Sequence, residues 1–127
     1  MPITLDYTPE DGFVRAMVAG AVTMADFRAG LEHLVTSDVI PSTAPILYDM
    51  RAMDPGGLSF SEAVGLMGYR RGVDEKRGGT KVAFLVASDA AYGTVRLWQN
   101  LTQDEPGVTS TYQIFRDEGE AVAWLKP

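Results

Sequence analysis

The side chains best suited to chemistry follow two predicted strands, at the point where each strand ends. They are Asp49, Arg51 and Asp54 after one strand and Ser88, Asp89, Tyr92 and Arg96 after the next. Ligands of open α/β sheets bind in the crevice outside the carboxyl ends of the strands, so these residues form a candidate ligand crevice. Two carboxylates beside an arginine can bind a cation or an amine, or exchange a proton with a substrate.

The same residues also suit a purely structural role. Asp49 and Arg51 can brace a loop through hydrogen bonds, and Ser88 or Asp89 can cap a helix. Asp54 opens a turn, because a proline follows it. We favour this structural interpretation, since caps and turns select these residue types. A hydrolase or isomerase that uses Asp49, Arg51 and Asp54 therefore ranks third among our functional hypotheses, behind an interaction module and a ligand carrier.

Other signatures of catalysis are weak in this sequence. His33 is the one histidine of the sequence. It lies about half a turn away from the apolar stripe of its predicted helix, so we expect it to face solvent. The chain has no cysteine, which excludes disulfides, thiolate nucleophiles and cysteine-bound metal. The GGTK segment at 78–81 lacks the spacing of a phosphate-binding loop and precedes a strand instead of a helix. We therefore expect no catalytic residue, no metal and no cofactor.

Length and charge narrow the class of protein. The chain has 127 residues, 46% of them hydrophobic, and a net charge of −6. This length suits one domain, which we expect to cover residues 1–127. The negative charge argues against nucleic acid as a partner, and no apolar run is long enough for membrane insertion. The first residues lack the pattern of a signal peptide, so a cytoplasmic location is expected.

The periodicity of apolar residues predicts the elements that position the candidate residues. Strands are predicted at 3–8, 13–19, 45–50, 81–87 and 108–115. The first two form a hairpin, and a helix follows each of the others as well as the second. Thr23 and Asp26 form a capping box at the start of the first helix. The order ββαβαβαβα predicts an α/β fold with a mixed, mostly parallel sheet and right-handed crossovers.

The second predicted helix carries two apolar stripes and several glycines. The stripe expected to face the core consists of Phe60, Ala63, Val64, Met67 and the stem of Arg71. A second stripe, on nearly the opposite side, consists of Leu66, Tyr69 and Val73. Between them lie Gly65, Gly68 and Gly72. Each glycine costs ~1 kcal/mol of helix stability relative to alanine, which is easier to understand if another backbone approaches closely.

Two interpretations of the second stripe stay open. A neighbouring loop of the same chain can cover it, or it can contact another polypeptide. We favour the intermolecular contact and predict a homodimer through this stripe and its glycines. Arg70 and Arg71 belong to the predicted surface, because the segment 70–81 holds five cations and two anions, a local charge of +3. These cations either offset the dipole of the helix end or attract an acidic partner, such as a second copy.

Two longer passages resemble a known family. They are ILYDMRAMDPGGLSF at 46–60 and FLVASDAAYGTVRLWQ at 84–99. Together with the order of the strands, they resemble the STAS-type family of anti-sigma-factor antagonists. The similarity is to a branch of small, uncharacterised bacterial proteins related to the sporulation antagonist, and it covers nearly the whole chain. It implies about four β-α turns of a right-handed superhelix, a topology shared with lipid carriers of the Sec14 type.

The resemblance breaks at one functional turn. Regulatory members carry an Asp-Ser-Ser-Gly-Leu turn after the third strand, and its first serine is phosphorylated to break a partner complex. The matching residues here are Asp54, Pro55, Gly56, Gly57 and Leu58. Because proline and glycine have no hydroxyl, we predict that this turn is not phosphorylated. In the family, the turn and the following helix contact the partner protein, which agrees with the predicted interaction surface.

The leading hypothesis is therefore a non-enzymatic protein-interaction or regulatory module that lacks the phospho-acceptor serine. Its expected partner is a second copy of the chain, as a homodimer, or another protein. The alternative is a carrier of a small apolar or lipid-like ligand, by analogy with the Sec14-type relatives. A ligand that co-purifies with the chain would favour the carrier, and a bare dimer would favour the interaction module.

Overall fold

Local sequence rules account for where several elements begin. The computed structural model describes residues 3–54, 60–77, 79–104, 107 and 109–126. Its elements are β1 (Ile3–Tyr7), β2 (Val14–Ala21), α1 (Met24–Thr36), β3 (Ile46–Asp54), α2 (Phe60–Arg77), β4 (Lys81–Leu85), α3 (Asp89–Asp104), β5 (Thr111–Phe115) and α4 (Glu118–Leu125). The predicted capping box is confirmed: the hydroxyl of Thr23 accepts from the N–H of Asp26, whose carboxylate accepts from the N–H of Thr23. This reciprocal contact satisfies backbone donors that the first turn of α1 would otherwise leave free.

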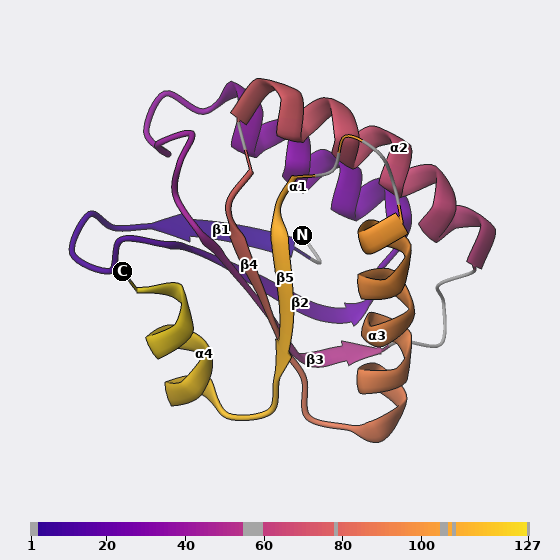
Figure 1. Ribbon diagram of the computed structural model, residues 1–127. Helices are drawn as coiled ribbons and strands as arrows, with labels where there is room; N and C mark the ends of the chain where they lie inside the picture. Colours follow the sequence, from indigo (N-terminus) through magenta and orange to yellow (C-terminus); the bar gives the residue numbers. More distant parts are fainter. Residues whose placement is uncertain (1–2, 55–59, 78, 105–106, 108, 127) are drawn as a thin grey trace.

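The five strands form one mixed sheet in the order β1-β2-β3-β4-β5 (Figure 1). β1 and β2 pair antiparallel, and the turn between them ends at Gly12, which has a φ of +74°. The other pairs are parallel, and a helix connects the two strands of each pair. The structure thus confirms the predicted ββαβαβαβα order and the mostly parallel α/β fold.

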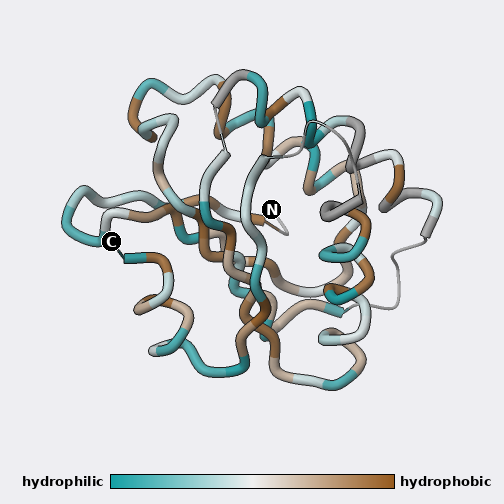
Figure 2. The backbone as a smooth tube through the Cα atoms, in the orientation of Figure 1, coloured by the Kyte–Doolittle hydropathy of each residue, from teal (hydrophilic) through white to brown (hydrophobic). Residues whose placement is uncertain are grey.

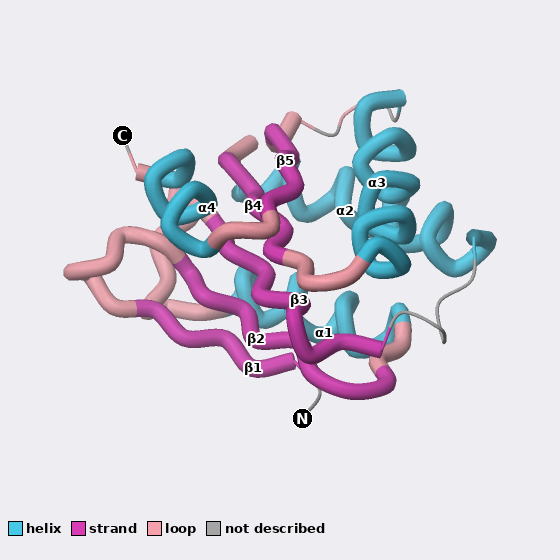
Figure 3. Tube along the Cα trace, turned by 90° about the horizontal axis from the view of Figure 1, so that it is seen from below, coloured by secondary structure: helices cyan, strands magenta, loops and turns pink. Residues whose placement is uncertain are grey.

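The helices cover the two faces of the sheet unequally. The first three helices lie on one face and share a large apolar cluster with it, whereas α4 packs on the other face over β3, β4 and β5 (Figures 1 and 3). The hydrophobic stretches of the chain accordingly meet where strands and helices face each other (Figure 2). Phe27 of α1 and Trp98 of α3 meet edge to face, with ring centroids 5.4 Å apart. Met17 on β2, beyond the reach of α4, stays 42% exposed.

The structure corrects the predicted orientation of α2. Val73 is 3% exposed within the large cluster and Tyr69 is half-buried against it, so the prediction that they form an outward stripe is wrong. Val64 and Arg71, which were expected to face the core, are exposed. The side chains of the other stripe residues, together with Gly68, lie outside the described part of α2; they are Phe60, Ala63, Leu66 and Met67.

The physical cause of this error is a pair of charges on the inner face of the helix. Arg70 and Asp74 are 3% and 4% exposed and pair with each other. The face of α2 that packs against the rest of the protein therefore carries charged side chains. The outward face instead carries Gly65 and Gly72, where an added Cβ would meet nothing within 4 Å.

Candidate functional site

Asp49 and Arg51 form a closed ion pair on β3. Their side chains share one face of the strand, because they are two residues apart. Arg51 donates from Nε to Oδ1 of Asp49 at 3.0 Å and from Nη2 to Oδ2 at 2.7 Å. Its backbone N–H also donates to Oδ1, at 3.2 Å. Such two-point contacts between a guanidinium and a carboxylate are strong and geometrically specific.

Two further residues extend this pair across neighbouring elements. Arg15 of β2 lies 3.7 Å from the carboxylate of Asp49 and 3.2 Å from that of Glu118. Arg51 also reaches Glu118, at 3.0 Å. Glu118 is the first residue of α4, where a negative charge is favoured by the helix dipole. The four charges therefore tie β2, β3 and α4 together and balance one another.

These contacts fix the protonation state of Asp49. The hydrogen bond from the Arg51 side chain has the largest influence and holds the pKa of Asp49 below its ordinary value, although burial opposes it. The same hydrogen bond raises the pKa of Arg51. Asp49 thus stays ionised at neutral pH, with both oxygens occupied, and a carboxylate of lowered pKa is a poor general base. The geometry favours the structural interpretation of this pair.

The candidate residues after β4 belong to a separate group. The hydroxyl of Ser88 accepts from the N–H of Ala91 at 3.1 Å, which is a helix-capping contact at the start of α3. Asp89 accepts from Arg116 at 2.7 Å, and the guanidinium of Arg116 lies 5.1 Å from the ring centre of Tyr92. Each of these polar groups therefore has a local partner.

Arg96 and Asp54 complete the set of candidate residues. Arg96 donates to the side chain of Gln99 at 2.7 Å. Asp54 ends β3 and is exposed, and the turn that follows it, residues 55–59, lies outside the described residues. The prediction that this turn is not phosphorylated stays a prediction. The described contacts therefore join Asp49 to Arg51, whereas the residues after β4 contact α3 or Arg116.

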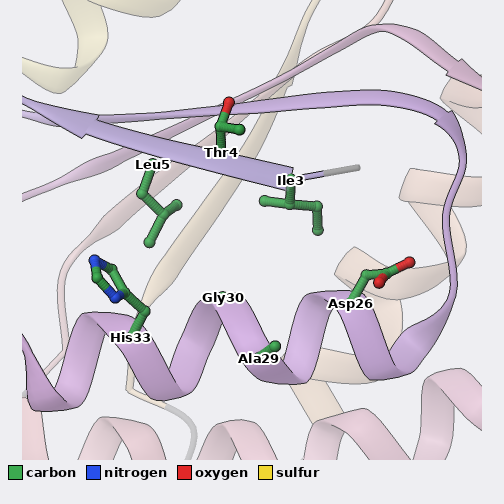
Figure 4. Close-up of a pocket in the computed structure, with 7 residues that line it drawn as sticks. All are labelled: Ile3, Thr4, Leu5, Asp26, Ala29, Gly30 and His33. Carbon is green, nitrogen blue, oxygen red and sulfur yellow. The ribbon is translucent and has the colours of Figure 1, made fainter. Parts of the chain in front are cut away.

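A groove of about 410 Å³ lies between β1 and α1, away from all of these residues (Figure 4). Its lining consists of Ile3, Thr4, Leu5, Asp26, Ala29, Gly30 and His33. His33 is exposed, as the sequence predicts, and stands at one end of the groove. The lining contains one hydroxyl, that of Thr4, which points away from α1 and therefore away from His33 (Figure 4). The surface of the groove is mostly apolar, which suits an apolar side chain or ligand.

A second polar cluster, which the sequence did not predict, joins α2 to the segment before β5. The carboxylate of Asp74 accepts from the backbone N–H groups of Thr109 and Ser110, at 2.9 and 3.1 Å. It also accepts from the hydroxyl of Ser110 at 3.0 Å, and this hydroxyl accepts from Arg70 at 3.1 Å. Nε of Arg70 lies 3.2 Å from Asp74, but its direction does not suit a hydrogen bond. The contact is thus an ion pair, and the cluster anchors the segment that leads into β5.

Besides Nε of Arg70, the cluster contains a second buried polar group without a hydrogen bond from the described residues. The hydroxyl of Tyr112 is buried, and the described residues provide no hydrogen-bond partner for it. Burial raises the pKa of Tyr112, so its hydroxyl stays protonated. The guanidinium of Arg70 lies 5.6 Å from the centre of the same ring. Arg70 is therefore an internal residue, and its predicted place on an interaction surface is wrong, whereas Arg71 is exposed.

Neither a metal-binding group nor a membrane-spanning helix is found in the described part of the chain. Within it, no three acidic or histidine side chains are placed to hold a metal ion. None of its helices combines the length and the apolar character that crossing a bilayer requires.

Solved structures of other proteins share this fold over nearly the whole chain. One crystal structure, of an uncharacterised DUF3478-family protein with a SpoIIAA-like fold from Shewanella loihica, matches with a TM-score of 0.59 and 18% identity. The match covers 98% of this chain and 92% of that chain. The unphosphorylated form of the anti-sigma factor antagonist SpoIIAA matches with a TM-score of 0.50 and 15% identity, over 96% of each chain. No curated protein matches the sequence.

The family model gives the more specific result. The model of the SpoIIAA-like family matches residues 13–126, which is most of the 127-residue chain. The fold, the order of the elements and this match agree with the resemblance found in the sequence. The chain therefore belongs to the SpoIIAA-like family.

Proposed function

We propose that the protein is a non-enzymatic regulatory module that binds another protein through the outward face of α2. One observation carries this proposal: Val64 is 47% exposed there, and Gly65 and Gly72 have open space where side chains would begin. Glycines on a helix surface allow another backbone to approach closely. The structural similarity to SpoIIAA, an antagonist of an anti-sigma factor, supports a protein as the partner.

The state of the polar residues supports a module without catalysis. A general base needs a pKa near the working pH and a free lone pair, but Asp49 has a lowered pKa and both of its oxygens accept from Arg51. Ser88 is engaged at the start of α3, and Asp89 pairs with Arg116. These contacts explain the conspicuous polar residues as braces and caps.

A photo-reactive amino acid at position 64 tests the proposal in living cells. The expected result is a discrete cross-link to one other protein, which disappears when Gly72→Arg is added to the same chain. The matched control carries the photo-reactive group at Leu97, which is 40% exposed on α3. Equal cross-links from both positions, or a cross-link at 64 that survives Gly72→Arg, would contradict the proposal.

Gly72→Ala separates binding from folding at the same position. Because an added Cβ meets nothing within 4 Å, the substitution should raise the free energy of unfolding by about 0.5–1 kcal/mol. Chemical denaturation of the purified protein measures this change. A loss of stability would mean that the face is already covered within the chain, and the proposed surface would not exist.

A second candidate function is the carriage of a small apolar ligand. The observation that favours it is the groove between β1 and α1, with its volume of about 410 Å³ and its mostly apolar lining. Native mass spectrometry of freshly purified protein distinguishes the two functions. A stoichiometric extra mass that Gly30→Trp removes would support the carrier, and a bare polypeptide would support the interaction module.

A further inference from the structure

The two edges of the sheet are protected differently. At the β5 edge, the side chain of Gln99 from α3 donates to the carbonyl of Tyr112 at 2.8 Å. Gln99 is 9% exposed, so a helix side chain occupies part of this edge. At the other edge, β1 pairs with β2 alone, and the described chain places no strand or hydrogen-bonding side chain beyond it. Such an edge offers unpaired N–H and C=O groups to another strand.

The groove described above runs along this open edge. Ile3 and Leu5 point from β1 toward α1, whereas Thr4 points away from it (Figure 4). Because side chains from both faces of β1 line the groove, the groove runs along the open edge of the strand. Its other wall is the flank of α1, where Gly30 leaves a gap: an added Cβ would lie 3.8 Å from Ile3. A strand added to β1 would bring its apolar side chains to this wall.

We propose that β1 pairs antiparallel with β1 of a second copy, across a two-fold axis at Leu5. This register uses all five residues of the strand, ITLDY. Leu5 lies opposite Leu5 of the second copy, and Ile3 lies opposite Tyr7 of the second copy, so the face toward α1 is apolar on both sides. On the other face, Thr4 lies opposite Asp6 of the second copy.

Charge selects this register over its neighbour. With the axis at Asp6, two carboxylates would lie directly opposite each other, which is unfavourable in a sheet. With the axis at Leu5, each carboxylate meets a hydroxyl. A two-fold contact needs such self-complementarity, because the same patch serves both copies. The proposal replaces the α2 stripe as the contact between copies, and it does not rest on the proposed function, which uses a different surface.

Cross-linking through introduced cysteines tests the register, because the chain has no cysteine of its own. Directly opposed residues of an antiparallel pair have Cα atoms ~4.5–5.5 Å apart, which suits a disulfide. Under mild oxidation, Leu5→Cys should form a covalent dimer. Thr4→Cys and Asp6→Cys should cross-link to each other in a mixture more than either does alone. Gln113→Cys, exposed on the β5 edge, is the matched control and should stay monomeric.

Charge substitutions test the same contact at equilibrium by analytical ultracentrifugation. Wild type should dimerise at tens of micromolar, and Thr4→Asp should weaken the dimer roughly tenfold, because it creates two like-charge pairs. Thr4→Lys should leave the dimer unchanged or tighter, and Gln113→Asp and Gln113→Lys should change nothing. A monomeric wild type, a shift of equal size with Asp and Lys at position 4, or cross-linking of Leu5→Cys only to other proteins would overturn the proposal.

Discussion

Two ion pairs of this protein use the same charges in opposite surroundings. In the pair on β3, the side chain of Asp49 is 3% exposed but that of Arg51 is 46% exposed. In the pair on α2, the side chains of Arg70 and Asp74 are 4% and 1% exposed. An arginine at the surface can turn to water when its partner is lost, whereas a buried one cannot. The surroundings of an ion pair, more than its charges, therefore decide how much the fold depends on it.

The two pairs also differ in what they hold. Asp49 is bound mainly by Arg51, two residues away, and the pair reaches other elements through exposed side chains. Asp74 instead accepts two backbone N–H groups from Thr109 and Ser110, at the entrance to β5. Losing this carboxylate would leave backbone donors without partners in a part-buried segment, which is costly. The buried pair therefore anchors a strand, and the half-exposed pair braces a surface.

The largest expected effect comes from Asp74→Asn. The substitution leaves Arg70 buried without its counter-charge, which in comparable cases costs about 3–5 kcal/mol of unfolding free energy. Chemical denaturation with purified protein measures it. Arg70→Met is the control, and it should cost less, because Asp74 keeps its hydrogen bonds from Thr109 and Ser110. If Asp74→Asn cost no more than Asp49→Asn, the comparison would fail.

Asp49→Asn should have an intermediate effect. It removes charged hydrogen bonds to Arg51 but leaves that arginine in contact with water and with Glu118, so we expect a loss of ~1–3 kcal/mol. Thermal and chemical denaturation give the value. A ligand-binding role would instead leave stability nearly intact and abolish binding to a partner or ligand once one is known.

The pH dependence of stability provides a second test of the Asp49–Arg51 pair. Arg51 holds the pKa of Asp49 in the folded protein below the ordinary value of 3.8. The stabilisation is therefore present above that value and is lost as the pH falls through the folded pKa. The difference in unfolding free energy between wild type and Asp49→Asn should stay constant from about pH 8 to pH 5 and shrink below about pH 4. A difference that varies between pH 6 and pH 8 would point to another titrating group.

The smallest effect is expected for Arg116→Gln. Its partner Asp89 is 94% exposed, and exposed pairs contribute less than about 1 kcal/mol. The stability of this variant should lie close to wild type in dilute buffer, and even closer at about 0.5 M salt, which screens exposed charges. A salt-insensitive loss as large as that of Asp74→Asn would show that exposure does not rank these pairs.

Local rules predicted more of this molecule than long-range ones. The capping box of Thr23 and Asp26 involves residues three apart, and its side-chain chemistry is legible in the sequence. The mostly parallel α/β class follows from the alternation of strands and helices along the chain, so it was predictable. Of the candidate crevice, the sequence predicted that Asp49 and Arg51 act as hydrogen-bonded braces and that Ser88 or Asp89 caps a helix. It did not predict that Asp49 and Arg51 bond to each other within β3.

The orientation of α2 was not predictable for a physical reason. Charged residues normally mark the solvent side of a helix, but the partners of Asp74 are 35 and 36 residues away, on the other side of β4. No periodicity within the helix reports such a contact. The open edge of β1 was equally hidden, because it depends on which strand ends the sheet.

The order of the strands has a consequence for how the chain folds during its synthesis. Each strand pairs with the strand before it in the sequence, so the sheet can grow one strand at a time as the chain leaves the ribosome. α4 links positions far apart in the sequence: Leu125 shares a cluster with Phe13, and Glu118 meets Arg15 across 103 residues. Until α4 emerges, the apolar face of β3 and β4 that this helix covers stays open, so closure of the second core waits for residues far along the chain.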